Sequence, residues 1–273
     1  MTQSDLKLTT GFQPRDETDW RAAIEKVLKG GDFAKRLVSK TADDIELLPL
    51  YMQAREADNV APAHAGRPWQ IAQRVDHPDA EQANKLALED LENGAGSLVL
   101  VFDHSFTSRG YGLNPDSPDH LDRALKNVAL DMISIRIEAG DAGEQCAGNV
   151  ATLIEERGHN PSQMSVDFGL APLAALMTTG TRMIDWATTG EKLKGTITDL
   201  KSKGFKGPFI CADARPISEA GGSEAQELAA ALASAVAYLR ALEASGMDLA
   251  EAADAIAFVL PVDAGQFESI AKL

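Results

Sequence analysis

The chain has 273 residues, of which 44% are hydrophobic, so it can bury a sizeable core as one large domain or two small ones. Asp and Glu outnumber Lys and Arg by 41 to 26, and the net charge of −15 argues against nucleic acid and membrane-surface partners. Cys146 and Cys211 lie far apart, and neither a secretory leader nor an apolar run of about 18 residues is found. We therefore expect a cytoplasmic protein without disulfides.

Residues 1–66 are predicted to form an arm that is separate from the rest of the chain. Its first half should contain an amphipathic helix, because apolar residues recur there at helical spacing: Trp20, Ile24, Val27 and Leu28. Gly30 and Gly31 then end the pattern. Residues 61–66, which include Pro62 and precede Pro68, are typical of a linker.

Residues 67–273 alternate between short apolar segments and helical ones. After a strand-like segment at 69–75, five segments are predicted to be buried strands: 97–102, 132–137, 164–168, 208–211 and 255–260. Strands that alternate with helices imply βαβ units and a parallel sheet, so the expected class is α/β.

The clearest helix begins at Ser223, which forms a capping box with Gln226, and it ends before Gly246. One apolar stripe of this helix is expected to face the core: Leu228, Leu232, Val236, Leu239 and Leu242.

Common catalytic and nucleotide-binding motifs are missing from the sequence, including G-x-G-x-x-G, the P-loop, H-E-x-x-H and G-x-S-x-G. The five histidines have no metal-ligand spacing. Only His104 is of interest, because it follows Phe102 and Asp103 at the carboxyl end of a predicted strand. Parallel sheets and barrels place their binding groups at that edge.

Two long segments carry a resemblance to a known family. Residues 67–79 (RPWQIAQRVDHPD) and residues 219–248, with EAGGSEAQEL and VAYLRALEASGMD, resemble the substrate-binding barrel of methylmalonyl-CoA mutases. Similar segments at 28–33 and 267–273 extend the resemblance over nearly the whole chain. It implies an N-terminal helical arm followed by part of a (β/α)₈ TIM-type barrel. We count about five of its eight strands, so we expect the barrel to be incomplete.

The family converts methylmalonyl-CoA into succinyl-CoA by radical chemistry with adenosylcobalamin, which supplies the difficult step. Active members carry a Tyr between the substrate and the adenosyl group, and a His that donates to the thioester carbonyl. The matching positions here hold Arg74 and Pro216, and proline has no side-chain donor. The D-x-H-x-x-G motif that ligates cobalt is also absent. The resemblance therefore implies the small (beta), non-catalytic type of subunit, without a catalytic residue or a cofactor of its own, in an adenosylcobalamin-dependent complex.

A possible remnant of the substrate site is the segment from Phe102-Asp103 to Arg109-Gly110-Tyr111, which is similar to a loop of active members. It makes Asp103, Arg109 and Tyr111 candidates for contacts with a CoA ester, and Arg74 and Arg215 candidates for contacts with its phosphates. The alternative for Asp103 and Arg109 is an ion pair within the loop or charges exposed to solvent. The alternative for Arg74 and Arg215 is that they fill a pocket that has lost its function.

Three functions remain open at this point. The chain is a non-catalytic partner of a mutase large subunit, the substrate barrel of an active acyl-CoA mutase whose cobalamin domain lies on another chain, or a CoA-ester binding module without turnover. An incomplete parallel sheet exposes unpaired backbone groups at its edges. We therefore expect either self-association or folding together with the large subunit.

Overall fold

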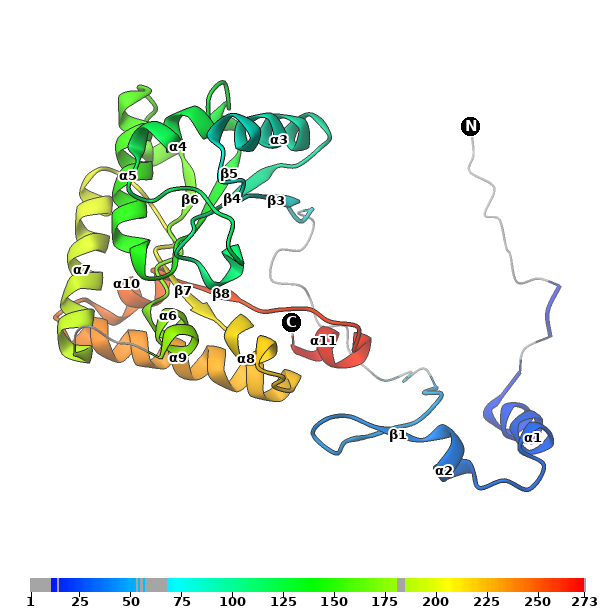
Figure 1. Ribbon diagram of the computed structural model, residues 1–273. Coiled ribbons are helices and arrows are strands. Elements are labelled where there is room, and N and C mark those ends of the chain that lie inside the picture. Colours follow the sequence, from blue (N-terminus) through cyan, green and yellow to red (C-terminus); the bar gives the residue numbers. More distant parts are fainter. Residues whose placement is uncertain are drawn as a thin grey trace. The chain divides into compact units, whose positions relative to one another are not determined.

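The computed structural model describes residues 11–13, 15–52, 54, 56, 68–180 and 185–272, and it divides the chain into two compact units, Met1–Gly66 and Arg67–Leu273 (Figure 1). The expected linker at residues 61–66 lies outside the described residues. Within the described part of the chain, no helix is both long and apolar enough to cross a membrane.

The described residues of the arm contain two helices and one short pair of strands. That helix, α1 (Glu17–Leu28), begins at Asp16, whose carboxylate accepts from the backbone N–H of Asp19. It is followed by α2 (Phe33–Leu37) and by an antiparallel pair, β1 (Ser39–Lys40) with β2 (Glu46–Leu47). Trp20 packs edge-on against Phe33 at 6.2 Å. None of the described arm residues is buried, so these residues form no hydrophobic core of their own.

The larger unit is built on parallel strands. β3 (Ala72–Val75), β4 (Ser97–Val101), β5 (Ser134–Glu138) and β6 (Ser165–Asp167) form one sheet in chain order. β7 (Ile210–Asp213) and β8 (Ile256–Val259) form a second parallel pair. A parallel bridge from Leu170 to Ile210 joins β6 to β7, so the six strands follow one another in chain order.

The expected α/β class with a parallel sheet is confirmed. The count of about five barrel strands was one too low for the described residues of the larger unit, because the strand-like segment at 69–75 contains β3, which pairs with β4.

Helices cover the outside of the strands (Figure 1). Their bounds are α3 (Ala80–Glu92), α4 (Pro118–Ala124), α5 (Gly143–Glu156), α6 (Pro172–Thr179), α7 (Trp186–Ser202), α8 (Arg215–Glu219), α9 (Glu224–Ala244), α10 (Leu249–Asp254) and α11 (Gln266–Lys272). Most begin at a side chain that accepts from a first-turn N–H, including Asp79, Ser117, Asp185 and Asp248. The capping box of Ser223 and Gln226 is present.

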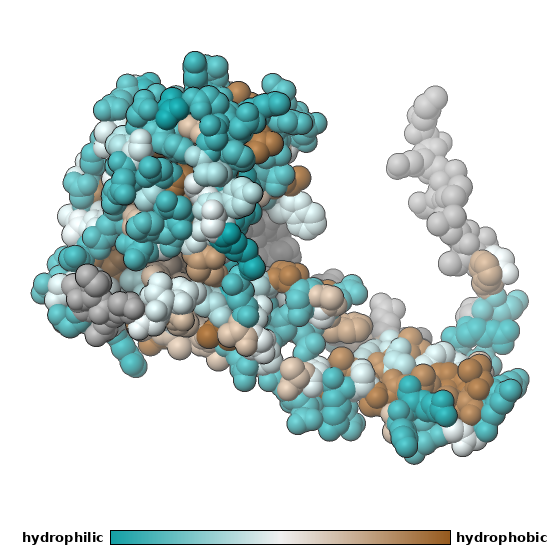
Figure 2. Space-filling model, viewed as in Figure 1, coloured by the Kyte–Doolittle hydropathy of each residue, from teal (hydrophilic) through white to brown (hydrophobic). Residues whose placement is uncertain are grey.

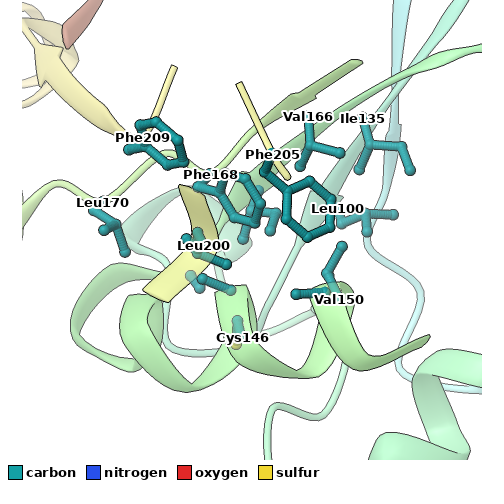
Figure 3. Packing of buried hydrophobic residues seen from close by; sticks show 14 of the residues in the cluster. Leu100, Ile135, Cys146, Val150, Val166, Phe168, Leu170, Leu200, Phe205 and Phe209 are labelled. Atoms are coloured by element: carbon teal, nitrogen blue, oxygen red, sulfur yellow. The ribbon is translucent and has the colours of Figure 1, made fainter. Parts of the chain in front are cut away.

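The hydrophobic core lies between the strands and these helices. Phe168, directly after β6, stacks on Phe209 at 5.5 Å and meets Phe205 edge-on at 5.2 Å (Figure 3). Leu100 and Ile135 contribute to the same core from β4 and β5. Successive side chains of a strand point to opposite faces of the sheet, so the residues between these buried apolar ones lie on the other face.

The expected inward stripe of α9 was wrong for two of its members. Leu232 and Val236 are 51% and 43% exposed, whereas Ala231, Ala235 and Tyr238 are buried. The helix is apolar on both sides, so hydrophobic periodicity could not identify its inner face. Tyr238 fixes the orientation, because its hydroxyl accepts from the backbone N–H of Leu173 at 3.0 Å.

His120 on α4 should make stability depend on pH. It is buried and its Nε2 has no hydrogen-bond partner among the described residues. Burial lowers the pKa of His120 below its usual 6.5; Arg123 also lowers it, whereas Asp79, Glu81 and Asp119 oppose the shift. Below pH 6.5 the unfolded chain therefore binds more protons than the folded one, and the free energy of unfolding should fall until the lowered pKa is reached.

This pH dependence can be measured from urea unfolding midpoints at pH 7.5 and 5.5. We expect His120→Gln to lose less stability than the wild type over this interval. Equal losses in the two proteins would show that His120 does not contribute.

Candidate functional site

The carboxyl ends of the parallel strands bring charged side chains to one edge of the sheet. On β5, Ile135 and Ile137 are buried in the core, so Arg136 and Glu138 lie on the other face. Asp213 ends β7, and Arg215 opens α8 directly after it.

Arg215 is the centre of a network of ion pairs. Its Nη1 donates to Glu138 Oε1 at 2.6 Å, and its Nε and Nη2 donate to the Asp213 carboxylate at 2.9 and 2.6 Å. Thr107 Oγ1 donates to the second oxygen of Glu138 at 2.8 Å. The Phe106 ring lies 5.4 Å from the guanidinium carbon. The guanidinium is therefore held on three sides by groups of the chain itself.

The electrostatics of this network favour the charged forms of Glu138 and Arg215. Burial alone would raise the pKa of Glu138, but Arg215, Arg136 and the Thr107 hydroxyl outweigh it and hold the pKa below the usual 4.5. Burial alone would lower the pKa of Arg215, and hydrogen bonds and charges from Asp213 and Glu138 raise it instead.

A second arginine, Arg136, extends the network along the inner face of the sheet, which is the face opposite the helix-covered core. Arg136 Nε lies 3.7 Å from Glu138 and 3.8 Å from Asp167, and its Nη2 donates to Cys211 Sγ at 3.5 Å. Burial raises the pKa of Asp167, against the charge of Arg136. Arg136 Nε is buried without a hydrogen-bond partner among the described residues. A neighbouring cavity of about 20 Å³ has room for one water molecule.

A larger cavity of about 480 Å³ opens in front of the network, within the size range of small-molecule sites. Four of the five proposed substrate-binding residues line it: Arg74, Arg109, Tyr111 and Arg215. The other lining residues are Asp76, Thr107, Ser108 and Glu219. Arg74 and Arg109 each form an ion pair with a carboxylate that also lines the cavity. Arg74 Nη2 donates to Asp76 Oδ2 at 3.1 Å and to the Thr107 carbonyl at 2.8 Å, and Arg109 Nη2 lies 2.9 Å from Glu219 Oε1.

Asp103 is the proposed residue that does not line this cavity. Its carboxylate lies 3.9 Å from His104 Nε2, and His104 Nδ1 lies 2.9 Å from Asp141 Oδ1. Arg109 pairs with Glu219 instead of Asp103, so the alternative of an ion pair within the loop is not formed. Gly112 shapes the loop: at its φ of +122° a Cβ would lie 2.4 Å from the Asp103 nitrogen.

Pro216 occupies the first turn of α8 and is buried. This position suits proline, which needs no N–H there, but it offers the site no donor. The residues lining the 480 Å³ cavity include neither His nor Cys, so they do not provide a ligand suited to the cobalt of adenosylcobalamin. Among the described residues, no cluster of three or more His, Cys, Asp or Glu could hold a metal ion.

The sequence reasoning missed Glu138, Asp213 and Glu219 as partners of the arginines. A signal for the first two was present, because each carboxylate comes at the end of an apolar strand segment. The same criterion selected Asp103 and His104.

Taken together, the fold and the site define a parallel α/β domain with a charged cavity at the carboxyl edge of its strands. The family model described as methylmalonyl-CoA mutase matches residues 58–273. The chain therefore belongs to the methylmalonyl-CoA mutase family. The resemblance found in the sequence is thereby confirmed.

Several curated relatives carry the name of a mutase subunit. The methylmalonyl-CoA mutase small subunits of Streptomyces virginiae and Propionibacterium freudenreichii subsp. shermanii are each 29% identical, over 98% and 100% of this chain. The large subunit of Streptomyces virginiae is 24% identical over 98% of this chain. The chain spans only 45%, 44% and 40% of the length of these three proteins.

Proposed function

We propose that this chain acts as a non-catalytic, small-subunit-like partner in an adenosylcobalamin-dependent methylmalonyl-CoA mutase. The observation that carries the proposal is that Arg215, which lines the cavity, is bound by Glu138 and Asp213. A guanidinium that is already neutralised by two buried carboxylates has no charge left to offer a substrate, and an incoming anion would be repelled by both of them.

The two positions that match catalytic residues of active members support the same proposal. Arg74 is engaged by Asp76 and by the Thr107 carbonyl, and Pro216 is a helix-starting residue without a donor. Cofactor and substrate would therefore be handled by the large subunit, and adenosylcobalamin belongs to that chain in the proposed complex.

We also propose that the six strands are part of a (β/α)₈ TIM-type barrel, as in the family. Their parallel order and the polar inner face with Arg136, Glu138, Asp167 and Asp213 support this arrangement. β3 and β8 each pair with a single strand among the described residues, so further strands would pair with these two edges.

A CoA-ester binding module without turnover is the second candidate, and the 480 Å³ cavity is the observation that favours it. Arg74, Arg109 and Tyr111 could contact phosphates there only if the anion displaced Asp76 and Glu219 from the two arginines. CoA retained by the purified chain would support this function over the first one.

The arm provides the test of the partner role. Its helix α1 carries Val27, which is 79% exposed, next to the half-buried Ile24, and no described arm residue is buried. We expect Ile24→Asp/Val27→Asp to weaken co-purification with the mutase large chain of the native host at least about 10-fold, since burying one such side chain is worth about 1.5–3 kcal/mol. Co-purification is measured by pull-down and quantified by mass spectrometry of the bound chains.

Ala22→Asp serves as the control, because it adds a charge to the opposite side of the same helix. It should leave co-purification unchanged, and circular dichroism should show all variants folded. A wild-type chain that captures no large chain, or a double variant that captures as much as the wild type, would contradict the partner role of the arm.

A further inference from the structure

The arm exposes a cluster of apolar side chains within one short segment, residues 45–52 (IELLPLYM). Five of these eight residues are large, apolar and 41–60% exposed: Ile45, Leu48, Leu50, Tyr51 and Met52. Elsewhere among the described residues, no stretch of eight exposes more than two such side chains. Figure 2 shows brown side chains on the arm, near the position of β1 and α2 in Figure 1. Concentrated apolar surface of this kind marks a site of contact with another molecule.

Hydrogen bonds hold the segment in a defined conformation. The backbone N–H of Thr41 donates to the Ile45 carbonyl at 2.9 Å, and Thr41 Oγ1 accepts from the Ile45 N–H at 3.1 Å. Farther along, the Tyr51 hydroxyl accepts from the Leu48 N–H at 3.0 Å. Both halves of the segment are therefore tied to the backbone around them. A surface that is ordered before it binds loses less conformational entropy on binding.

The segment begins in a hairpin that lacks support within the described arm. β1 and β2 form a two-stranded sheet, and a hairpin of this size is only marginally stable in water without a third strand or a packed helix. Pro49, which follows β2 closely, has no N–H with which to extend the pairing. None of the described arm residues is buried. The stability of this conformation therefore depends on a surface outside the arm.

We propose that residues 45–52 anchor the arm in an apolar groove of the mutase large chain. This inference rests on the proposed partner role and adds a second contact to that of helix α1. The family model matches from residue 58 onward, so the segment precedes the domain that the family shares. Its role is therefore separate from that of the barrel and its cavity.

The charges around the segment define the chemistry of the groove. The segment itself carries one charge, on Glu46, and the hairpin turn before it contains Asp43 and Asp44. An apolar floor with Lys or Arg at its rim would complement this pattern. A second copy of this chain is a poor match, because its net charge of −15 would oppose the same acidic residues.

Affinity for the large chain tests the anchor. In Leu48→Asp/Leu50→Asp the dissociation constant for the purified large chain of the native host should rise at least about 10-fold, because two apolar side chains that leave water on binding become charged. Leu86→Asp is the matched control. Leu86 lies on α3, outside the arm, and its exposed fraction of 47% is close to the 45% and 41% of Leu48 and Leu50. This control should leave the constant unchanged.

A photo-cross-link identifies the surface that covers the segment, and it does not depend on the aspartate variant being folded. With p-benzoylphenylalanine at position 50, irradiation of the full chain mixed with the large chain should join position 50 to the large chain. The same probe at position 86 should give no such product. Mass spectrometry of the linked peptides identifies the partner residues.

Several results would overturn the proposal. Cross-links from position 50 to the chain's own larger unit, or to a second copy, would assign the segment to a different occupant. Wild-type affinity of Leu48→Asp/Leu50→Asp together with weak binding by Ile24→Asp/Val27→Asp would reject this anchor and leave the partner role intact. A wild-type chain that binds no large chain would reject the partner role and the anchor with it.

Discussion

Replacing Arg215 by Met is expected to lower the free energy of unfolding by about 3–5 kcal/mol, because removing one partner of a buried ion pair leaves uncompensated charge. Glu138 and Asp213 are only 8% and 3% exposed, and both depend on this guanidinium for their charge-assisted hydrogen bonds. For a domain whose total stability is about 5–15 kcal/mol, this loss is large. Urea unfolding followed by circular dichroism measures it.

Arg109→Met is the matched control for this substitution. It removes an ion pair whose two side chains are 73% and 43% exposed, and such pairs contribute about 0–1 kcal/mol. If Arg215→Met were no more costly than Arg109→Met, the network would not have the structural role assigned to it.

The stability difference caused by Arg215→Met should also depend on pH. In the wild type the lowered pKa of Glu138 contributes stability that is present above the usual 4.5 and is lost as the pH falls through the lowered value. The variant lacks the arginine that most strongly lowers this pKa, so its Glu138 binds a proton at a higher pH than the wild-type Glu138 does. The difference in stability between the two proteins should therefore narrow as the pH falls from the Glu138 pKa of the variant to the lower Glu138 pKa of the wild type.

Restoring the two family residues, in Arg74→Tyr/Pro216→His, is expected to leave isomerisation of methylmalonyl-CoA at the background level. The substitutions return a phenol and an imidazole to the cavity, but Arg215 still lines it and stays bound to Glu138 and Asp213. The cavity also remains open to water, which radical chemistry must exclude. The assay measures succinyl-CoA formed in the presence of added adenosylcobalamin.

The contrary outcome would identify a different function. If the double variant became active when mixed with a chain that carries a cobalamin domain, the barrel would be the substrate part of an active acyl-CoA mutase. The control in that mixture is the same variant with Arg215→Met, whose fold must first be checked by circular dichroism.

The strands could be predicted from the sequence because each one contributes apolar side chains to the helix-covered core. The strand predicted at 132–137, for example, contains residues 134–137 of β5, which runs from Ser134 to Glu138. The ends were less accurate where a strand continues in charged residues: β7 runs to Asp213, beyond the apolar segment 208–211. These charged ends belong to the inner face, which has no hydrophobic pattern.

The site could be predicted only as a set of residues, and its pairings could not. Arg215 and Glu138 are 77 residues apart, and Arg109 and Glu219 are 110 residues apart. Such pairs result from the order of the strands in the sheet, which no local spacing encodes. Arg109 likewise pairs with Glu219 on α8, and not with the nearby Asp103 of its own loop.

The most direct test of the non-catalytic role is an assay of the purified wild-type chain with adenosylcobalamin and methylmalonyl-CoA. We expect no succinyl-CoA above the background and no cobalamin absorbance that stays with the protein through gel filtration. Turnover by this chain alone, or cobalamin retained by it, would contradict the proposed function.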